Sequence, residues 1–225
     1  MTRPRPEDPT VLDPAGVAYH QLLAFPARPE LADALERSPL FGVRRHGNGA
    51  TCEWLQFSAE SDPSPFPLAR IRSHREGVLL EAFSERRLSL LRRAAREAGA
   101  GEIAADQLRV FRVADALADP ARLIQPLHDA SGEPLTPREV AADYLRMAWA
   151  WIPRDELGNR PPASVVGTGR GRALLEPVLD TLGRALRSEI PTFPAMSSDE
   201  LHEILLPEAR PRTPAPAPPR SARNR

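Results

Sequence analysis

The sequence has no lysine, one cysteine and few aromatic residues, and these shortages limit the kinds of site and core that the chain can form. With only Cys52, the chain cannot form an internal disulfide or a zinc site built from several cysteines. Aromatic residues make up 5% of the chain, so leucine, valine, isoleucine and alanine must supply most of any core. All 30 basic residues are arginine, which we attribute to coding bias in a GC-rich genome.

The chain also lacks net charge and long apolar runs. Because the formal net charge is zero, no overall field favours nucleic acid or an anionic membrane, and a basic binding surface would have to be a local patch. No stretch approaches the roughly 20 apolar residues that cross a bilayer. The N-terminal residues have no apolar signal core. We therefore predict a soluble, cytoplasmic protein that does not bind membranes.

Residues 16–118 carry the pattern of an α+β domain. Apolar residues alternate over 17–25, as on a half-buried strand. Hairpins follow at 41–57 and 69–83, each with glycine in its turn. A helix capped by Ser84 and a strand at 107–113 complete the unit. This order predicts a mostly antiparallel sheet with helices on one face.

Prolines mark the segments between and beyond these elements. Residues 1–15 read as a disordered arm and 207–225 as a disordered Pro/Arg-rich tail, because neither has enough apolar side chains to fold. Residues 119–134 read as a polar connector. The segment 61–67, with prolines at 63, 65 and 67, is expected to be a surface loop.

Residues 135–206 are predicted to form a helical C-terminal module. Thr136, Pro137 and Glu139 have the spacing of a capped helix start. The helix expected at 140–152 is apolar nearly all round, so either the chain's own domain or a second chain must cover it. Pro177 is expected to kink or divide the helix that follows.

Candidate catalytic and metal-binding residues do not assemble into a recognisable set. Cys52 occupies a strand position and reads as a small core residue. The five histidines have no pair at a helical i, i+4 spacing. Gly167–Gly171 has neither the Rossmann nor the Walker spacing, so we interpret it as a capping turn with Thr168 near the N-cap. We therefore predict no metal and no cofactor. A small hydrolase or transferase would need a pocket that brings together His128, Asp143 or Arg172.

A basic helix face provides an alternative function. It consists of Arg86, Arg87, Arg92, Arg93 and Arg96. Such a face can bind the phosphates of a nucleic acid. It can equally be the solvated side of an amphipathic helix, and we favour this second interpretation.

The segment from Trp149 to Leu175 resembles a module of uncharacterised bacterial proteins, some of which carry SEC-C tails. More distantly, it is similar to the toxin-binding region of the MbcA/ParS/Xre antitoxins. The matching positions are Trp149, Pro153, Leu157, Gly158, Asn159, Arg160, Pro162, Gly171, Arg172 and Leu175. The hairpin and helix from Ile71 to Leu91 are also similar to the segment that precedes the module. The resemblance implies a non-catalytic module whose role in most of the proteins that carry it is unknown.

Two interpretations of the tryptophans remain open, because Trp149 and Trp151 suit a core and a binding hot spot about equally well. We predict a non-catalytic protein-interaction protein that binds another protein or a second copy of itself, with nucleic acid as the alternative partner. The predicted partner-binding residues are Tyr144, Trp149, Trp151, Pro153, Leu157, Gly158, Arg160 and Arg172.

Overall fold

The fold was obtained as a computed structural model. It describes residues 17–24, 30–47, 49–57, 63–103, 107–127, 133–166, 169–189 and 196–205. The predicted arm at 1–15 and tail at 207–225 lie outside these residues.

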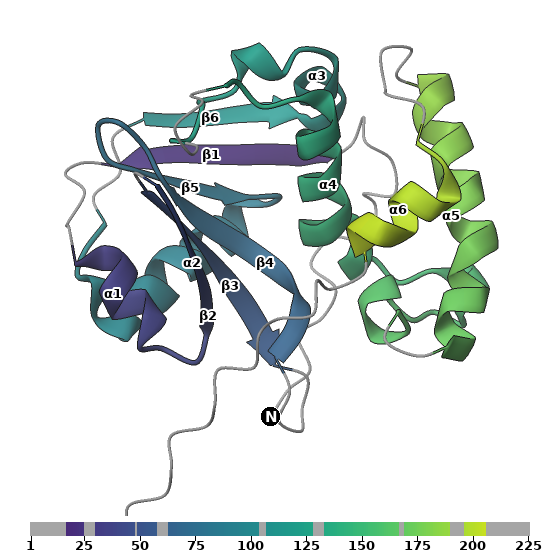
Figure 1. The fold of residues 1–225 in the computed structure, drawn as a ribbon, viewed down its shortest axis with the longest axis horizontal. Helices are drawn as coiled ribbons and strands as arrows, with labels where there is room; N and C mark the ends of the chain where they lie inside the picture. The colour runs from purple at the N-terminus through teal and green to yellow at the C-terminus, as the bar shows by residue number, and fades with distance from the viewer. Residues whose placement is uncertain are drawn as a thin grey trace, which may run out of the picture.

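A six-stranded antiparallel sheet forms the first part of the fold, in the order β2-β3-β4-β5-β1-β6 (Figure 1). Its strands are β1 (Ala18–Ala24), β2 (Phe41–His46), β3 (Gly49–Phe57), β4 (Pro63–Ser73), β5 (Val78–Ala82) and β6 (Gln107–Arg112). Both predicted hairpins are present, as β2–β3 and β4–β5. The predicted α+β class is confirmed.

Helices α1 (Leu31–Glu36) and α2 (Glu85–Ala95) cover one face of the sheet. Sheet residues such as Ile71 and Leu80 share an apolar cluster with Leu35 and Leu91 of these helices. The Ser84 hydroxyl caps α2 by accepting a hydrogen bond from the backbone N–H of Arg87, at 3.2 Å. The helix continues as a π-helical turn, Arg96–Ala100, in which Gly99 has a φ of 89°.

The remaining helices lie at the other face and beyond it. They are α3 (Val113–Ala118), α4 (Pro137–Met147), α5 (Gly169–Glu189) and α6 (Ser198–Leu205). Thr136 and Glu139 form the predicted capping box at the start of α4. Figure 1 shows α5 and α6 beside α4, on its side away from the sheet. None of the described helices is both long and apolar enough to cross a membrane.

The segment predicted as a surface loop at 61–67 is in part a strand, because β4 begins at Pro63. The register between β3 and β4 shifts on either side of Leu55, as at a β-bulge. A bulge interrupts the ladder of backbone hydrogen bonds, so prolines without an N–H fit there. Phe66 is consequently buried in the core instead of lying in a loop.

The helix predicted at 140–152 is shorter, and the helix containing Pro177 is longer than expected. Helix α4 ends at Met147, and a 3₁₀ turn, Trp149–Trp151, follows it. Helix α5 passes through Pro177 without dividing. Proline removes one backbone hydrogen bond, but the buried stripe containing Leu175, Leu179 and Leu182 offsets that loss.

Candidate functional site

The segment Trp149–Val166, here called the elbow, joins α4 to α5 through three short 3₁₀ turns. The tip of the elbow, residues 155–160, is closed by two backbone hydrogen bonds. The N–H of Arg154 donates to the Arg160 carbonyl at 3.1 Å, and the N–H of Asn159 donates to the Arg154 carbonyl at 2.9 Å. Gly158 and Asn159 both have positive φ, at 66° and 57°. Glycine and asparagine adopt positive φ more readily than other residues, so this pair of residues suits the tight turn at the tip.

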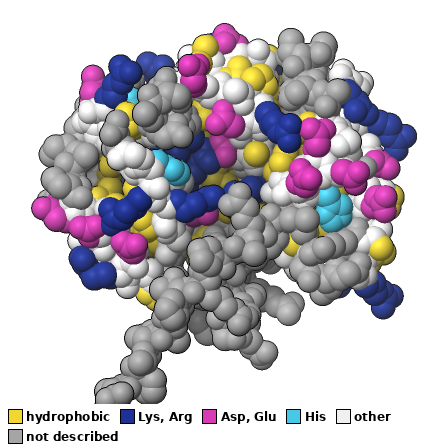
Figure 2. Space-filling view, in the orientation of Figure 1, with side chains coloured by type: hydrophobic (Ala, Val, Ile, Leu, Met, Phe, Trp, Pro, Cys, Tyr) yellow, Lys and Arg dark blue, Asp and Glu magenta, His cyan; other side chains and the backbone are white. Residues whose placement is uncertain are grey.

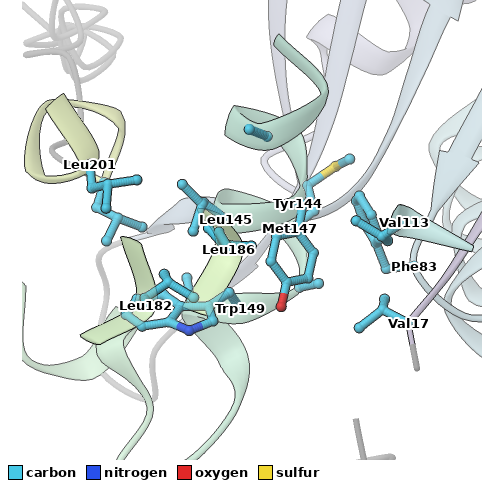
Figure 3. Packing of buried hydrophobic residues seen from close by; sticks show 14 of the residues in the cluster. Val17, Phe83, Val113, Tyr144, Leu145, Met147, Trp149, Leu182, Leu186 and Leu201 are labelled. Carbon is cyan, nitrogen blue, oxygen red and sulfur yellow. The ribbon is translucent and has the colours of Figure 1, made fainter. Parts of the chain in front are cut away.

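The inner part of the predicted partner-binding set belongs to the core. Trp149 is 0% exposed, and Tyr144 and Leu157 are also buried. Figure 3 shows Trp149 beside Leu182 and Leu186, while Tyr144 points towards Phe83. The helix end that needed covering is therefore covered by its own chain.

The outer part of the same set faces solvent or the rim of the sheet. Gly158 and Arg160 are exposed, and Pro153 is half-buried. Trp151 is also half-buried and donates its indole N–H to the Pro67 carbonyl at 3.3 Å. Arg172 lies on α5, and its side chain is outside the described residues. Among the predicted residues with described side chains, only the elbow tip is presented to a partner.

Arg154 is a site residue that was not singled out from the sequence. Its guanidinium carbon lies 4.9 Å from the centroid of the Trp149 ring. Burial lowers the pKa of Arg154. The Nε and Nη2 atoms of Arg154 and the indole nitrogen of Trp149 are buried without an acceptor among the described residues. The start of the elbow, Trp149–Arg154, here called its root, thus has buried hydrogen-bond donors that lack acceptors among the described residues. The arginine five residues after Trp149 was the available signal, but only a folded elbow brings the two together.

A buried ionic network lies within the sheet and connects to α4 through Arg70 and Asp143. Figure 2 shows basic side chains near the centre of one face of the molecule. Glu81 lies at the centre of the network and is 0% exposed. Its carboxylate accepts from Arg70 Nε at 2.6 Å, Arg72 Nε at 2.6 Å and the Tyr19 hydroxyl at 2.5 Å. Gln21 donates a further hydrogen bond at 2.9 Å. Every described partner of this carboxylate comes from a sheet strand.

Besides a longer ion pair between Glu53 of β3 and Arg146 of α4, at 3.7 Å, three polar contacts of the described residues extend from the sheet and α2 to the helical module. Arg70 pairs with Asp143 of α4 through both terminal guanidinium nitrogens. The Arg87 guanidinium donates to the Met147 carbonyl at the end of α4. The third contact is the bond from Trp151 to Pro67. They hold the elbow at a fixed position relative to the sheet.

Stability is expected to fall in acid because of Glu81. Burial alone would raise the pKa of Glu81, but the charges of Arg70 and Arg72 outweigh it and hold the pKa well below its usual range. The stabilisation is therefore complete above the unfolded-state pKa of about 4.3 and is lost as the pH falls from there towards the folded-state value.

Urea unfolding of the wild type and of Glu81→Gln between pH 7 and pH 3 measures this effect. We expect the wild type to lose stability more steeply than the variant below about pH 4.3. Equal slopes in the two proteins would show that Glu81 does not cause the acid sensitivity.

The basic face of α2 is less available than its sequence suggests. Arg87 bonds to the Met147 carbonyl, and Arg92 donates to the Ile103 carbonyl at 2.9 Å. Arg93 pairs with Glu97 at 2.8 Å. Arg86 and Arg96 remain exposed. The predicted patch is thus divided between internal and solvent-facing arginines.

The described polar groups near the turns of the two hairpins are not arranged as a nucleophile with a base. A hollow of about 480 Å³ there is lined by side chains that include Cys52, His46 and His74. Burial raises the pKa of the Cys52 thiol to about 12, so it stays protonated, as expected of a core residue. His46 contacts Thr51 at 3.0 Å, and His74 Nδ1 accepts from the Glu76 N–H at 3.3 Å.

The residues named for a hydrolase or transferase are not brought together in the described structure. Asp143 is paired with Arg70, His128 lies outside the described residues, and so does the Arg172 side chain. The described residues also contain no cluster of His, Cys, Asp or Glu able to hold a metal ion. The capping turn expected at Thr168 likewise lies outside them.

Comparisons with protein-family models, with curated proteins and with solved structures gave no match. Function is therefore inferred from the residues and their geometry.

Proposed function

We propose that this chain is a non-catalytic protein-interaction protein that binds a partner protein through the tip of its elbow. The observation that carries the proposal is a loop, 155–160, that its own backbone hydrogen bonds close and that is exposed at every residue except the buried Leu157. Backbone bonds at Arg154 fix the tip, and Trp149 and Leu157 anchor it in the core. Glu156 and Arg160 are exposed on it, and Arg160 Nε donates to the Leu157 carbonyl at 3.0 Å. Such preorganisation reduces the entropy that binding costs.

The unsatisfied donors at the root of the elbow support the same proposal. A buried donor without an acceptor lowers the stability of the fold by roughly 1–3 kcal/mol, so an acceptor supplied by a partner would be favourable. A partner that places a carboxylate or carbonyl oxygen at the elbow could satisfy Arg154 after a side-chain adjustment. Arginine stacked on tryptophan is also the kind of pair found at binding hot spots.

The partner class suggested by the sequence is a toxin-like bacterial protein. The elbow residues are those that resemble the toxin-binding region of antitoxins, and they include Gly158 and Arg160 at the exposed tip. We therefore propose an antitoxin-like role, in which the elbow occupies a surface of a second protein.

A charge reversal at the tip tests the proposal. Full-length wild type serves as bait in a lysate of the source organism, and the captured protein is then purified and titrated directly. We expect Glu156→Lys combined with Arg160→Glu to weaken its binding at least tenfold, which is about 1.4 kcal/mol. The matched control is Arg184→Glu, at an exposed arginine of α5 whose bonds among the described residues are to Asp180 and Thr181 of the same helix. Unchanged affinity of the double variant, or equal loss in the control, would contradict binding through the tip.

Nucleic-acid binding is the alternative proposal, and the exposed Arg86 and Arg96 are what favour it. It has less support because Arg87 and Arg92 bond to the chain's own carbonyls. This alternative predicts retention on DNA or RNA that weakens steeply with salt and is lost when Arg86, Arg93 and Arg96 become Glu. Absence of retention at low salt would remove it.

A further inference from the structure

Strand β6 leaves an apolar edge of the sheet open. It is the last strand in the sheet order, and no strand of the described residues lies beyond it. Leu108 is 51% exposed and Val110 is 53% exposed. Both belong to β6, and the third exposed large hydrophobic residue of the described chain is Leu174, on α5. The apolar exposure of the sheet is therefore concentrated on one edge strand.

The two edges of the sheet differ. On β2, at the opposite edge, Arg44 and Arg45 form ion pairs, with Glu53 at 2.8 Å and with Asp33 at 2.5 Å. Charged side chains of this kind discourage edge-to-edge association. Strand β6 contains no proline, and Leu108 and Val110 accompany its two arginines, Arg109 and Arg112. Of the two edge strands, only β6 combines charged side chains with exposed large hydrophobic residues.

The backbone of β6 is oriented for pairing with a further strand. The Val113 N–H donates to the Val17 carbonyl at 2.9 Å, so that pair is hydrogen-bonded in the antiparallel ladder. Hydrogen-bonded and non-bonded pairs alternate along such a ladder. With the β1–β6 register, the N–H and C=O groups of Leu108, Val110 and Arg112 point away from β1. The residues with outward backbone groups thus include both exposed apolar side chains.

We propose that β6 pairs antiparallel with β6 of a second copy of this chain, around a two-fold axis at Val110. In this register Val110 faces Val110 of the second copy, and Leu108 faces Arg112. On the other face of the sheet, Arg109 faces Phe111 and can stack on its ring. The outward N–H and C=O groups of β6 all find partners, and the sheet continues across the dimer.

Charge favours this register over its neighbour. A shift that centres the axis on Arg109 would place the two Arg109 side chains directly opposite each other, and like charges there are destabilising. In the Val110 register Arg112 faces leucine and keeps its own ion pair with Asp115, at 2.7 Å. The strand is therefore complementary to itself, which a two-fold interface requires.

The contact is narrow, so the dimer should be weak. One pair of short strands buries less than the roughly 1,600 Å² of a standard interface. We expect association that depends on concentration in the micromolar to millimolar range. This surface is separate from the elbow, so failure of either proposal leaves the other standing.

Cysteine cross-linking tests the register. In the proposed dimer, Val110→Cys places the two cysteines in a hydrogen-bonded pair. The Cα atoms of such a pair are about 5.5 Å apart, a separation that allows a disulfide between the two thiols. Leu108→Cys is the matched control, because its counterpart lies about 14 Å away along the strand. Native Cys52 is buried and gives little background. Under mild oxidation we expect covalent dimer from Val110→Cys at least tenfold above Leu108→Cys and Leu174→Cys.

Analytical ultracentrifugation of the wild type and of two lysine variants tests the association itself. We expect a rising dimer fraction with concentration for the wild type and only monomer for Val110→Lys. The Leu174→Lys variant should behave as the wild type. Because Val110 is half-exposed, its lysine variant should fold, and circular dichroism checks this. A wild type that stays monomeric up to millimolar concentration, or Val110→Cys that cross-links no better than Leu108→Cys, overturns the proposal.

Discussion

Replacing Glu81 with alanine is expected to lower the free energy of unfolding by about 3–5 kcal/mol, the usual cost of breaking a buried ion pair. The carboxylate is fully buried and accepts hydrogen bonds from Arg70, Arg72, Tyr19 and Gln21. Without it, the buried guanidinium of Arg72 loses its carboxylate partner, and that of Arg70 keeps Asp143. Urea unfolding followed by far-UV circular dichroism measures the loss.

A surface ion pair provides the control for this prediction. Glu97 pairs with Arg93 one helical turn away, and both side chains are exposed. Exposed pairs of this kind contribute about 0.3–0.5 kcal/mol, so Glu97→Ala should change stability little. If Glu81→Ala cost no more than Glu97→Ala, the buried network would not be a main source of stability.

The sequence was sufficient where local chemistry decides the structure. The turn at His74–Gly77, the cap at Ser84 and the capping box at Thr136 and Glu139 each depend on residues within a few positions. These signals do not require knowledge of the rest of the fold. The two hairpins and the helix starts could therefore be predicted, and with them the α+β class.

The errors occurred where distant parts of the chain outweigh local preference. Three prolines in 61–67 predicted a loop, yet pairing with β3 through a bulge makes residues from Pro63 part of a strand. Pro177 predicted a kink or a division into two helices, yet α5 is one helix with a buried face. In both places tertiary packing overrides propensity.

The candidate site could be predicted only in outline. The sequence located the elbow and its tryptophans, but not the division between a buried root and an exposed tip. Arg70, Glu81 and Asp143 are far apart in sequence, and periodicity alone gave no reason to group them. Arg154 stacks on Trp149 only because the elbow turns back on itself.

Replacing Trp149 with alanine is expected to cost about 3–5 kcal/mol of folding stability, as for a large aromatic residue removed from a core. Trp149 is 0% exposed and belongs to a cluster that joins the sheet, α4, α5 and α6. Its loss leaves a cavity beside Leu182 and Leu186, where Figure 3 places the indole. It also removes the ring on which Arg154 stacks.

Trp151→Ala distinguishes a core role from a binding role for these tryptophans. Trp151 is half-buried at the edge of the same cluster, so its truncation should cost less stability than that of Trp149. Urea unfolding and titration of the captured partner, run on both variants, separate folding from binding. A stable Trp149→Ala protein that has lost only partner binding would assign the buried indole to the interface. A strongly destabilised one would make it the foundation on which the exposed tip is held.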